Sequence, residues 1–177
     1  MPIGGIIRNL KGTSHLLAFI DTMILVWWVR KEASPGQANM IHRAQWLMES
    51  LERQDATVLI STVSLAEFLR GSSPRQQQEQ AAFLQKAFVV KGFDILSALV
   101  AAELYPKAAA VEDYEKKRTA LKADIQIVDT AIAAKANVLY SHDSACRRLA
   151  QVGGIEARDL PEIAPTLFHT ELDEDAP

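Results

Sequence analysis

Hydrophobic and polar positions along the chain follow two kinds of pattern. Short apolar runs without internal alternation lie at residues 16–20, 57–62, 87–93 and 137–141, with a weaker run at 154–158. Such runs are typical of strands that are buried on both faces, as in a parallel sheet. The sequence therefore predicts five short strands inside one domain.

Helical patterns fill the segments between these runs. At residues 36–53, an apolar stripe faces polar residues on the opposite side of the helix. Further helices are predicted at residues 21–32, 64–71, 74–88, 97–109 and 123–136, and at "SACRRLA" after Asp143. The polar stretch 111–122 is predicted to be a loop or an exposed helix. Strands that alternate with helices indicate an α/β domain with a mainly parallel sheet and right-handed crossovers.

The size and composition of the chain are those of one globular domain. It has 177 residues, of which 49% are hydrophobic and 23% are charged. The longest apolar run, 16–29, contains Asp21 and is shorter than the roughly 18 residues that a membrane-spanning helix needs, so no span is predicted. Residues 1–14 lack the features of a signal peptide and are expected to form a loose arm. The only cysteine, Cys146, cannot form an internal disulfide, so we expect a cytoplasmic protein.

The net charge of −3 comes from the C-terminal end of the chain. Residues 171–177 carry four acids and no base, which leaves 18 acids against 19 bases in the rest. The rest of the chain is thus nearly neutral, unlike a protein that binds nucleic acid through a large net positive charge. We predict a folded domain over residues 1–165 and a solvated acidic tail over residues 166–177.

Four acids lie near the ends of the predicted strands. Asp21 ends the first strand, Asp143 ends the fourth in "VLYSHD", Glu67 lies shortly after the second, and Asp124 opens the helix that leads into the fourth strand. Each has an ordinary structural explanation. Asp21 and Asp143 can be helix N-caps, and Ser64 and Glu67 can form a capping box. Asp124, in a first helical turn, can interact favourably with the positive end of the helix dipole.

Taken together, the four acids indicate a metal site. The carboxyl ends of parallel strands share one edge of a sheet, and four carboxylates at one edge repel one another unless a cation lies between them. Hard divalent cations such as Mg²⁺ and Mn²⁺ prefer oxygen ligands. Asp129 follows Asp124 by five residues, about 140° around the helix, so the two cannot share one narrow face. The position of Asp129 is left open by the pattern.

The same residues resemble the motifs of the PIN-domain family of metal-dependent ribonucleases, which includes the VapC-type toxins of bacterial toxin–antitoxin pairs. The motifs are "FIDT", "STVSLAEFLRG", "ADIQIVDTAIAAKA" and "SHD", and the resemblance covers about residues 16–160. Met23 departs from the Asn of many members, and Ser141 replaces the usual Thr. Asp129 is an extra acid, which in an alternative register would replace Asp124 as a ligand. The helix length to the fourth strand favours Asp124.

The resemblance implies a three-layer α/β/α sandwich around a mainly parallel five-stranded sheet. It implies an endoribonuclease that hydrolyses RNA phosphodiester bonds with Mg²⁺ or Mn²⁺. The metal ligands and catalytic residues would be Asp21, Glu67, Asp124 and Asp143, with Thr22 and Ser141 orienting these ligands or a water molecule. The implied partners are RNA, a small antitoxin and a second copy of the chain.

Basic residues flank the acidic motifs. Lys116, Lys117, Arg118 and Lys122 precede Asp124, and Arg147 and Arg148 follow Asp143, while Arg70 follows Glu67. Each alone reads as a solvated surface charge, but the set predicts contacts to RNA phosphates. His142, next to Asp143, is interpreted as a surface residue at a strand end, with substrate contact as the alternative.

Two other functions compete with the nuclease. The chain could be a PIN-like module that binds protein or RNA without catalysis, although it retains all four acids. A phospho-acceptor receiver domain would need a lysine at the end of a late strand, and "NVLYSHD" supplies none. The absence of a P-loop or GxGxxG motif argues against the nucleotide-binding α/β folds.

Overall fold

The computed structural model describes residues 15–109 and 118–163, apart from the side chains of residues 108–109 and 118–122. The predicted arm at residues 1–14 and the predicted acidic tail at residues 166–177 lie outside these ranges. The division of the chain into a domain and a tail therefore stays a prediction.

The sheet has five strands, and every neighbouring pair is parallel. The spatial order is β3-β2-β1-β4-β5, which places β1 at the centre. In the register, Phe19 of β1 lies beside Leu59 of β2 and Leu139 of β4. The five predicted strands are confirmed, and they are β1 (Leu17–Ile20), β2 (Thr57–Ser61), β3 (Val89–Lys91), β4 (Val138–Tyr140) and β5 (Glu156–Arg158).

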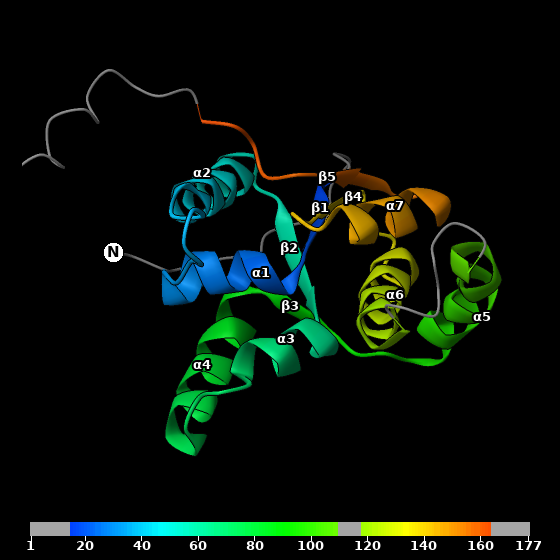
Figure 1. Ribbon diagram of the computed structural model, residues 1–177, viewed down its shortest axis with the longest axis horizontal. Coiled ribbons are helices and arrows are strands. Elements are labelled where there is room, and N and C mark those ends of the chain that lie inside the picture. Colours follow the sequence, from blue (N-terminus) through cyan, green and yellow to red (C-terminus); the bar gives the residue numbers. More distant parts are fainter. Residues whose placement is uncertain (1–14, 110–117, 164–177) are drawn as a thin grey trace, which may run out of the picture.

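Helices cover both faces of this sheet. In Figure 1, α1 to α4 lie on one side of the strands and α5 to α7 on the other, which confirms the three-layer sandwich. Within the described ranges, none of these helices has the length and apolarity needed to cross a membrane. The helices are α1 (Thr22–Leu25), which continues as the π-helix η1 (Val26–Arg30), α2 (Asn39–Arg53), α3 (Thr62–Leu69), α4 (Pro74–Ala87), α5 (Ile95–Ala109), α6 (Arg118–Ala133) and α7 (Ser144–Val152).

Alternate residues of the central strand enter two separate hydrophobic cores. Ala18 and Ile20 are fully buried in the core that contains Leu51 of α2. Phe19 is fully buried in the opposite core, which contains Val128 of α6. Because successive side chains of a strand point to opposite faces, a strand with a core on each side must be apolar throughout. This explains the unbroken apolar runs in the sequence.

The predicted helix starts at residues 36, 64, 97 and 123 differ from the observed ones, and those at 64 and 123 bear on the site. The helix expected from residue 64 begins at Thr62, and its N-cap is Ser61, whose hydroxyl accepts a hydrogen bond from the Ser64 N–H at 2.8 Å. Ser64 is therefore inside α3, and the predicted capping box with Glu67 does not exist. The helix expected from residue 123 begins at Arg118, so Asp124 is in its second turn and is not a first-turn acid.

Candidate metal centre

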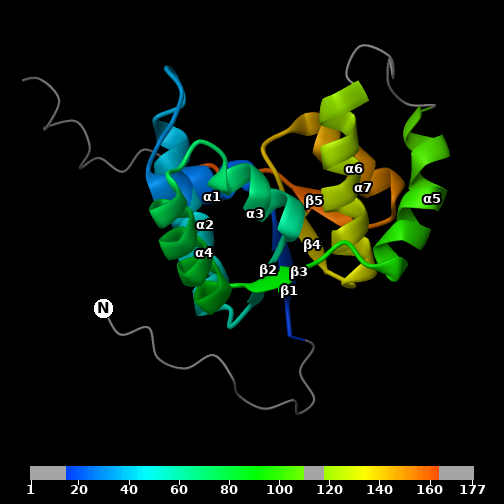
Figure 2. The ribbon, with the colours of Figure 1, turned by 90° about the horizontal axis from the view of Figure 1, so that it is seen from below.

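The carboxyl edge of the sheet brings together segments that are far apart in the sequence. Asp21 follows β1, Ser61 ends β2, and Ser141 follows β4, with a backbone hydrogen bond from the Asp21 N–H to the Tyr140 carbonyl at 3.1 Å. Helix α3 starts at this edge and contacts α6, as Figure 2 shows from below. The edge therefore collects the ends of three strands and the start of the helix that carries Glu67.

Asp21 is buried and hydrogen-bonded through both carboxylate oxygens at this edge. It is the N-cap of α1, as predicted, and its Oδ1 accepts the Thr22 N–H at 2.6 Å. Its Oδ2 accepts the Ser141 hydroxyl at 2.7 Å, and the residue is only 7% exposed. Burial raises the pKa of Asp21, the two hydrogen bonds lower it, and the charges of Glu67 and Asp143 raise it further. Three acids from separate segments therefore act on one another at this edge.

Glu67 reaches the edge from the second turn of α3. Its Oε2 accepts a hydrogen bond from the Thr22 hydroxyl at 2.7 Å. Thr22 therefore connects two of the acids, since its N–H binds Asp21 and its hydroxyl binds Glu67. The sequence predicted an orienting role for Thr22, and these two contacts are of the kind that such a role requires.

Asp143 caps the helix that follows β4. Its Oδ1 accepts hydrogen bonds from the N–H groups of Ala145 at 2.6 Å and Cys146 at 3.4 Å, as expected for an N-cap. The N–H of Asp143 donates to the Ser141 hydroxyl oxygen at 3.1 Å. The cap and the functional interpretation of Asp143 are thus compatible, because one carboxylate oxygen binds the helix while the residue lies beside Ser141.

Asp124 belongs to the same neighbourhood. It is half-buried in α6. The thiol of Cys146 is fully buried in α7, and burial raises its pKa well above the ordinary value, with further increases from the charges of Asp21, Asp124 and Asp143. All three carboxyl groups therefore act on a single thiol, so Asp124 is near the same edge as Asp21 and Asp143.

Asp129 occupies a different environment. It is fully buried, and its Oδ2 has no hydrogen-bond partner among the described residues. Its Oδ1 accepts a long 3.4 Å contact from the Thr130 hydroxyl. Burial raises the pKa of Asp129 to about 7, and no acid in the described part of the chain contributes to this shift. These contacts favour Asp124 over Asp129 as the fourth acid of the edge.

Hydrogen bonds to protein groups engage the carboxylates of Asp21 and Glu67. Among the residues that the structure describes, no three His, Cys, Asp or Glu side chains are arranged to hold a metal ion as they stand. Asp21 binds Thr22 and Ser141, while Glu67 binds Thr22. The donor set still fits a hard divalent cation, because it consists of carboxylate oxygens and because burial, with a smaller contribution from the charges of Glu67 and Asp143, raises the pKa of Asp21.

The predicted basic residues have different outcomes. Lys116 and Lys117 lie outside the described residues, and the side chains of Arg118 and Lys122 are likewise outside the description. Arg147 is described, and its guanidinium donates to the backbone carbonyls of Ser141 and His142, both at 2.7 Å. The predicted RNA contacts therefore stay predictions.

A comparison with known families identifies the fold. Residues 18–152 match the model of the PIN domain. The chain belongs to the PIN-domain family. The expected resemblance is thereby confirmed over most of its predicted range, and PIN domains are generally nucleases.

Solved structures with the PIN-domain fold include two similar ones. One is VapBC2 from Rickettsia felis, bound to a promoter DNA fragment, with 17% sequence identity and a TM-score of 0.57. The match covers 81% of this chain and 98% of the Rickettsia felis chain. VapBC-1 from nontypeable Haemophilus influenzae is 14% identical with a TM-score of 0.58, over 82% of this chain and 98% of that one. A search of curated proteins gave no match. At these identities the structural likeness shows the fold alone.

Proposed function

We propose that this PIN-domain protein is an endoribonuclease that hydrolyses RNA phosphodiester bonds with Mg²⁺ or Mn²⁺. One observation carries the proposal: three acids from separate segments meet at one edge, where Thr22 contacts Asp21 and Glu67, and the Ser141 hydroxyl contacts Asp21 and the Asp143 N–H. The charges of Glu67 and Asp143 add to burial in raising the pKa of Asp21, and a purely structural surface would not need a buried acid beside two others. Such a cluster is typical of functional sites.

The four acids would hold the metal, and the neighbouring hydroxyl groups would orient them. Asp21, Glu67, Asp124 and Asp143 are the proposed ligands and catalytic residues. A bound divalent ion lowers the pKa of a water molecule and neutralises charge that develops on the phosphate. Ser141 holds Oδ2 of Asp21, and Thr22 holds Oε2 of Glu67, which restricts both carboxylates before any metal arrives.

A cleavage assay tests the proposal. Purified protein should cut RNA with Mg²⁺ or Mn²⁺, lose this activity in EDTA, and lose it in the Asp21→Asn variant. Asp55→Asn is a matched control, because Asp55 is an exposed acid with a positive φ of 52°, which Asn tolerates well. The control should cut like the wild type. Cleavage that survives both EDTA and Asp21→Asn would contradict the proposal.

We further propose that the protein is the toxin of a toxin–antitoxin pair and acts on RNA in the cytoplasm. The support is the PIN-domain fold that it shares with VapBC2 and VapBC-1. Expression of the wild type in bacteria should arrest growth, and Asp21→Asn should not. Co-expression of a small protein from an adjacent reading frame should restore growth and co-purify with the chain. Unimpaired growth with wild-type protein that cuts RNA would remove the toxin assignment.

We also propose that a second copy of the chain is a partner, so that the protein forms a homodimer. Ile95, Leu96 and Leu99 of α5 are 79%, 60% and 60% exposed, so a second copy could cover an apolar surface there. Analytical ultracentrifugation of the purified chain tests this directly. A monomer at all protein concentrations would exclude the homodimer.

A PIN-like module without catalysis is the second candidate. It is favoured by the finding that, in the described part of the chain, no three potential ligands are arranged for a metal as they stand. Such a module would bind RNA or protein but neither bind Mn²⁺ nor cut RNA. Calorimetric titration with Mn²⁺, together with the cleavage assay, separates the two candidates.

A further inference from the structure

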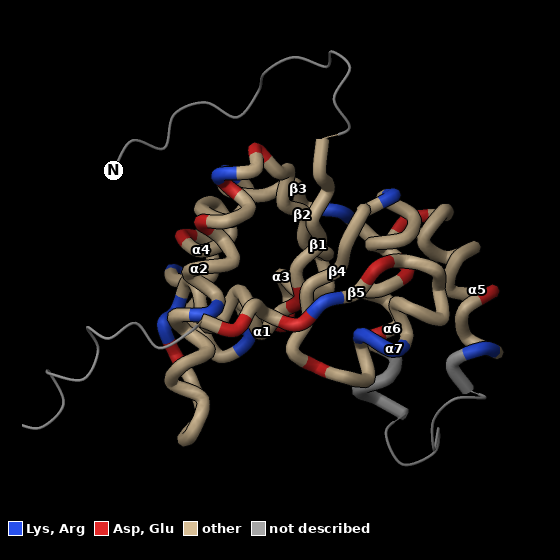
Figure 3. Tube along the Cα trace, turned by 90° about the horizontal axis from the view of Figure 1, so that it is seen from above, with Lys and Arg blue, Asp and Glu red and all other residues tan. Residues whose placement is uncertain are grey.

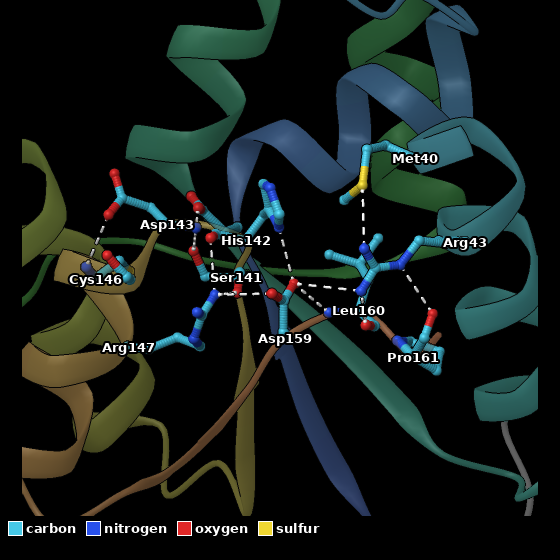
Figure 4. A network of polar contacts seen from close by, with 12 residues as sticks. Met40, Arg43, Ser141, His142, Asp143, Cys146, Arg147, Asp159, Leu160 and Pro161 are labelled. Carbon is cyan, nitrogen blue, oxygen red and sulfur yellow. Dashed lines mark hydrogen bonds and ion pairs between the residues drawn. The ribbon is translucent and has the colours of Figure 1, made fainter. Parts of the chain in front are cut away.

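Asp159 follows β5 directly and joins three other elements. Its Oδ1 lies 3.0 Å from His142 Nδ1 and 3.9 Å from Arg43 Nη2, and its Oδ2 lies 3.4 Å from Arg147 Nη1 (Figure 4). His142 belongs to the turn between β4 and α7, Arg43 to α2, and Arg147 to α7. In Figure 3, basic and acidic stretches of the trace likewise lie together around β5. One carboxylate thus links these elements beside the candidate metal centre.

Arg147 fixes the backbone of the turn that carries Asp143. Its Nη1 donates to the carbonyl oxygens of Ser141 and His142, each at 2.7 Å. The guanidinium presents several donors in one rigid plane, so it can hold two carbonyls and face a carboxylate at the same time. The side chain is only 22% exposed, which leaves little of it to meet an RNA backbone.

Asp159 is itself held firmly. Its Oδ1 accepts the Leu160 N–H at 2.7 Å, and Arg43 donates to the carbonyls of Leu160 and, at 3.0 Å, Pro161. The Ser141 N–H donates to the Arg158 carbonyl at 3.0 Å, which ties the turn to the end of β5. The segment after β5 therefore forms a fixed support against which the turn can be held.

We propose that Asp159 and Arg147 are positioning residues of the metal centre. They hold the turn Ser141–Asp143 so that the Ser141 hydroxyl faces Asp21 and the Asp143 carboxylate stays at the edge. The catalytic consequence rests on the proposed nuclease function. Asp159 lies beyond residues 18–152, which match the PIN-domain model, so the family match does not reach it. The inference also gives Arg147 a different role from the phosphate contact that the sequence predicted.

Substitutions that change or keep the side-chain charge distinguish a positioning role from a phosphate contact. Asp159 is an acid, so its replacement by Asn removes a charge that repels RNA and cannot remove a phosphate contact. Arg147→Lys keeps the positive charge that a phosphate contact needs, but it loses the planar group that binds two carbonyls and a carboxylate. A positioning role therefore predicts that both variants are defective, whereas a phosphate contact predicts that neither is.

The first measurement uses the metal-free protein and does not depend on activity. We expect Asp159→Asn and Arg147→Lys to speed amide hydrogen exchange at Asp143, Ala145 and Cys146 by about tenfold or more, because these N–H groups bond within the turn and its cap. Glu156→Gln is the matched control. Glu156 is an exposed acid of β5 that forms an ion pair with Arg158, at 2.6 Å. Unchanged exchange in both test variants would overturn the inference.

The second measurement follows the metal and the RNA separately. Both variants should raise the Mn²⁺ dissociation constant in calorimetry about 10–100-fold and lower kcat, with the RNA KM and its salt dependence unchanged. Glu156→Gln should match the wild type. If Arg147→Lys keeps wild-type Mn²⁺ affinity and Arg147→Ala lowers the salt slope of RNA binding by about one, Arg147 is a phosphate contact and the inference is wrong. If the wild type neither binds Mn²⁺ nor cuts RNA, the proposed function fails, and hydrogen exchange still decides whether these residues hold the turn.

Discussion

Ser141 donates its hydroxyl hydrogen bond to Asp21 Oδ2 over 2.7 Å, across 120 positions of sequence. Both residues are buried at the ends of neighbouring strands. The same hydroxyl oxygen accepts the Asp143 N–H at 3.1 Å, so one small side chain connects two of the acids. Its bond to Asp21 lowers the pKa of that carboxyl group against the opposing effect of burial.

Ser141→Ala should make the metal centre more sensitive to acid. Without the hydroxyl, the pKa of Asp21 rises further, so Mn²⁺ must compete with a proton at higher pH. We expect Mn²⁺ affinity, measured by calorimetry, to fall more steeply between pH 8 and pH 6 than in the wild type. Ser141→Thr keeps the hydroxyl and serves as the control. Identical pH dependence in the alanine variant and the wild type would contradict this prediction.

Asp21→Asn should stabilise the metal-free protein while it abolishes cleavage. The pKa of Asp21 is raised in the folded state, so folding becomes less favourable as the pH rises from 3.8 through that raised pKa. At pH 8 the neutral amide removes this penalty and the repulsion from Glu67 and Asp143. We expect Tm, measured by calorimetry without metal, to rise by about 2–4 °C.

The same Tm measurement with Mn²⁺ present tests the role of Asp21 in binding the metal. The metal should raise the Tm of the wild type because it binds the folded state, and it should raise the Tm of Asp21→Asn much less. A lower Tm for metal-free Asp21→Asn than for the wild type would show that its hydrogen bonds outweigh the repulsion.

Asp129→Ala should flatten the pH dependence of stability. The pKa of Asp129 rises from 3.8 to about 7 on folding, so its buried carboxyl group favours folding less as the pH climbs through this window, and the penalty is constant above it. Between pH 5 and pH 8 the wild type should lose roughly 2–3 kcal/mol of unfolding free energy that the variant does not lose. Urea denaturation at both pH values measures this. An equal loss of unfolding free energy in the wild type and the variant would show that Asp129 does not have a raised pKa in the folded state.

Replacing Lys116, Lys117 and Arg118 by Ala should weaken RNA binding mainly at low salt. Each lost contact to a single-stranded phosphate should reduce the slope of log K against log salt by about 0.7. Filter binding of a catalytically inactive Asp21→Asn background across a salt series measures the slope. Arg75→Ala on α4 is the control, because Arg75 is exposed and paired with Glu79 at 2.9 Å. An unchanged slope in the triple variant would remove these residues from the RNA surface.

Much of the fold could be predicted from local patterns. The apolar runs that became β1, β2 and β4 are unbroken because each strand has a core on both faces. Asp21 follows β1 directly and Asp143 lies three residues after the end of β4, so the shared edge of a parallel sheet was sufficient to bring them together. Helix starts were less certain, because Ser61 and Ser64 are both good N-caps and only the tertiary contacts select between them.

By itself, then, the sequence determined the strands, the order of the acidic motifs and their common edge, since burial and backbone hydrogen bonding follow short periods along the chain. Only the tertiary structure decided which groups each carboxylate meets. The contacts of Thr22 with Glu67, of Asp159 with Arg147, and the isolated burial of Asp129 join or separate side chains with no periodic relation in sequence. Such contacts depend on how the helix layers pack on the sheet, and a linear pattern of residue types does not specify which side chains that packing brings together.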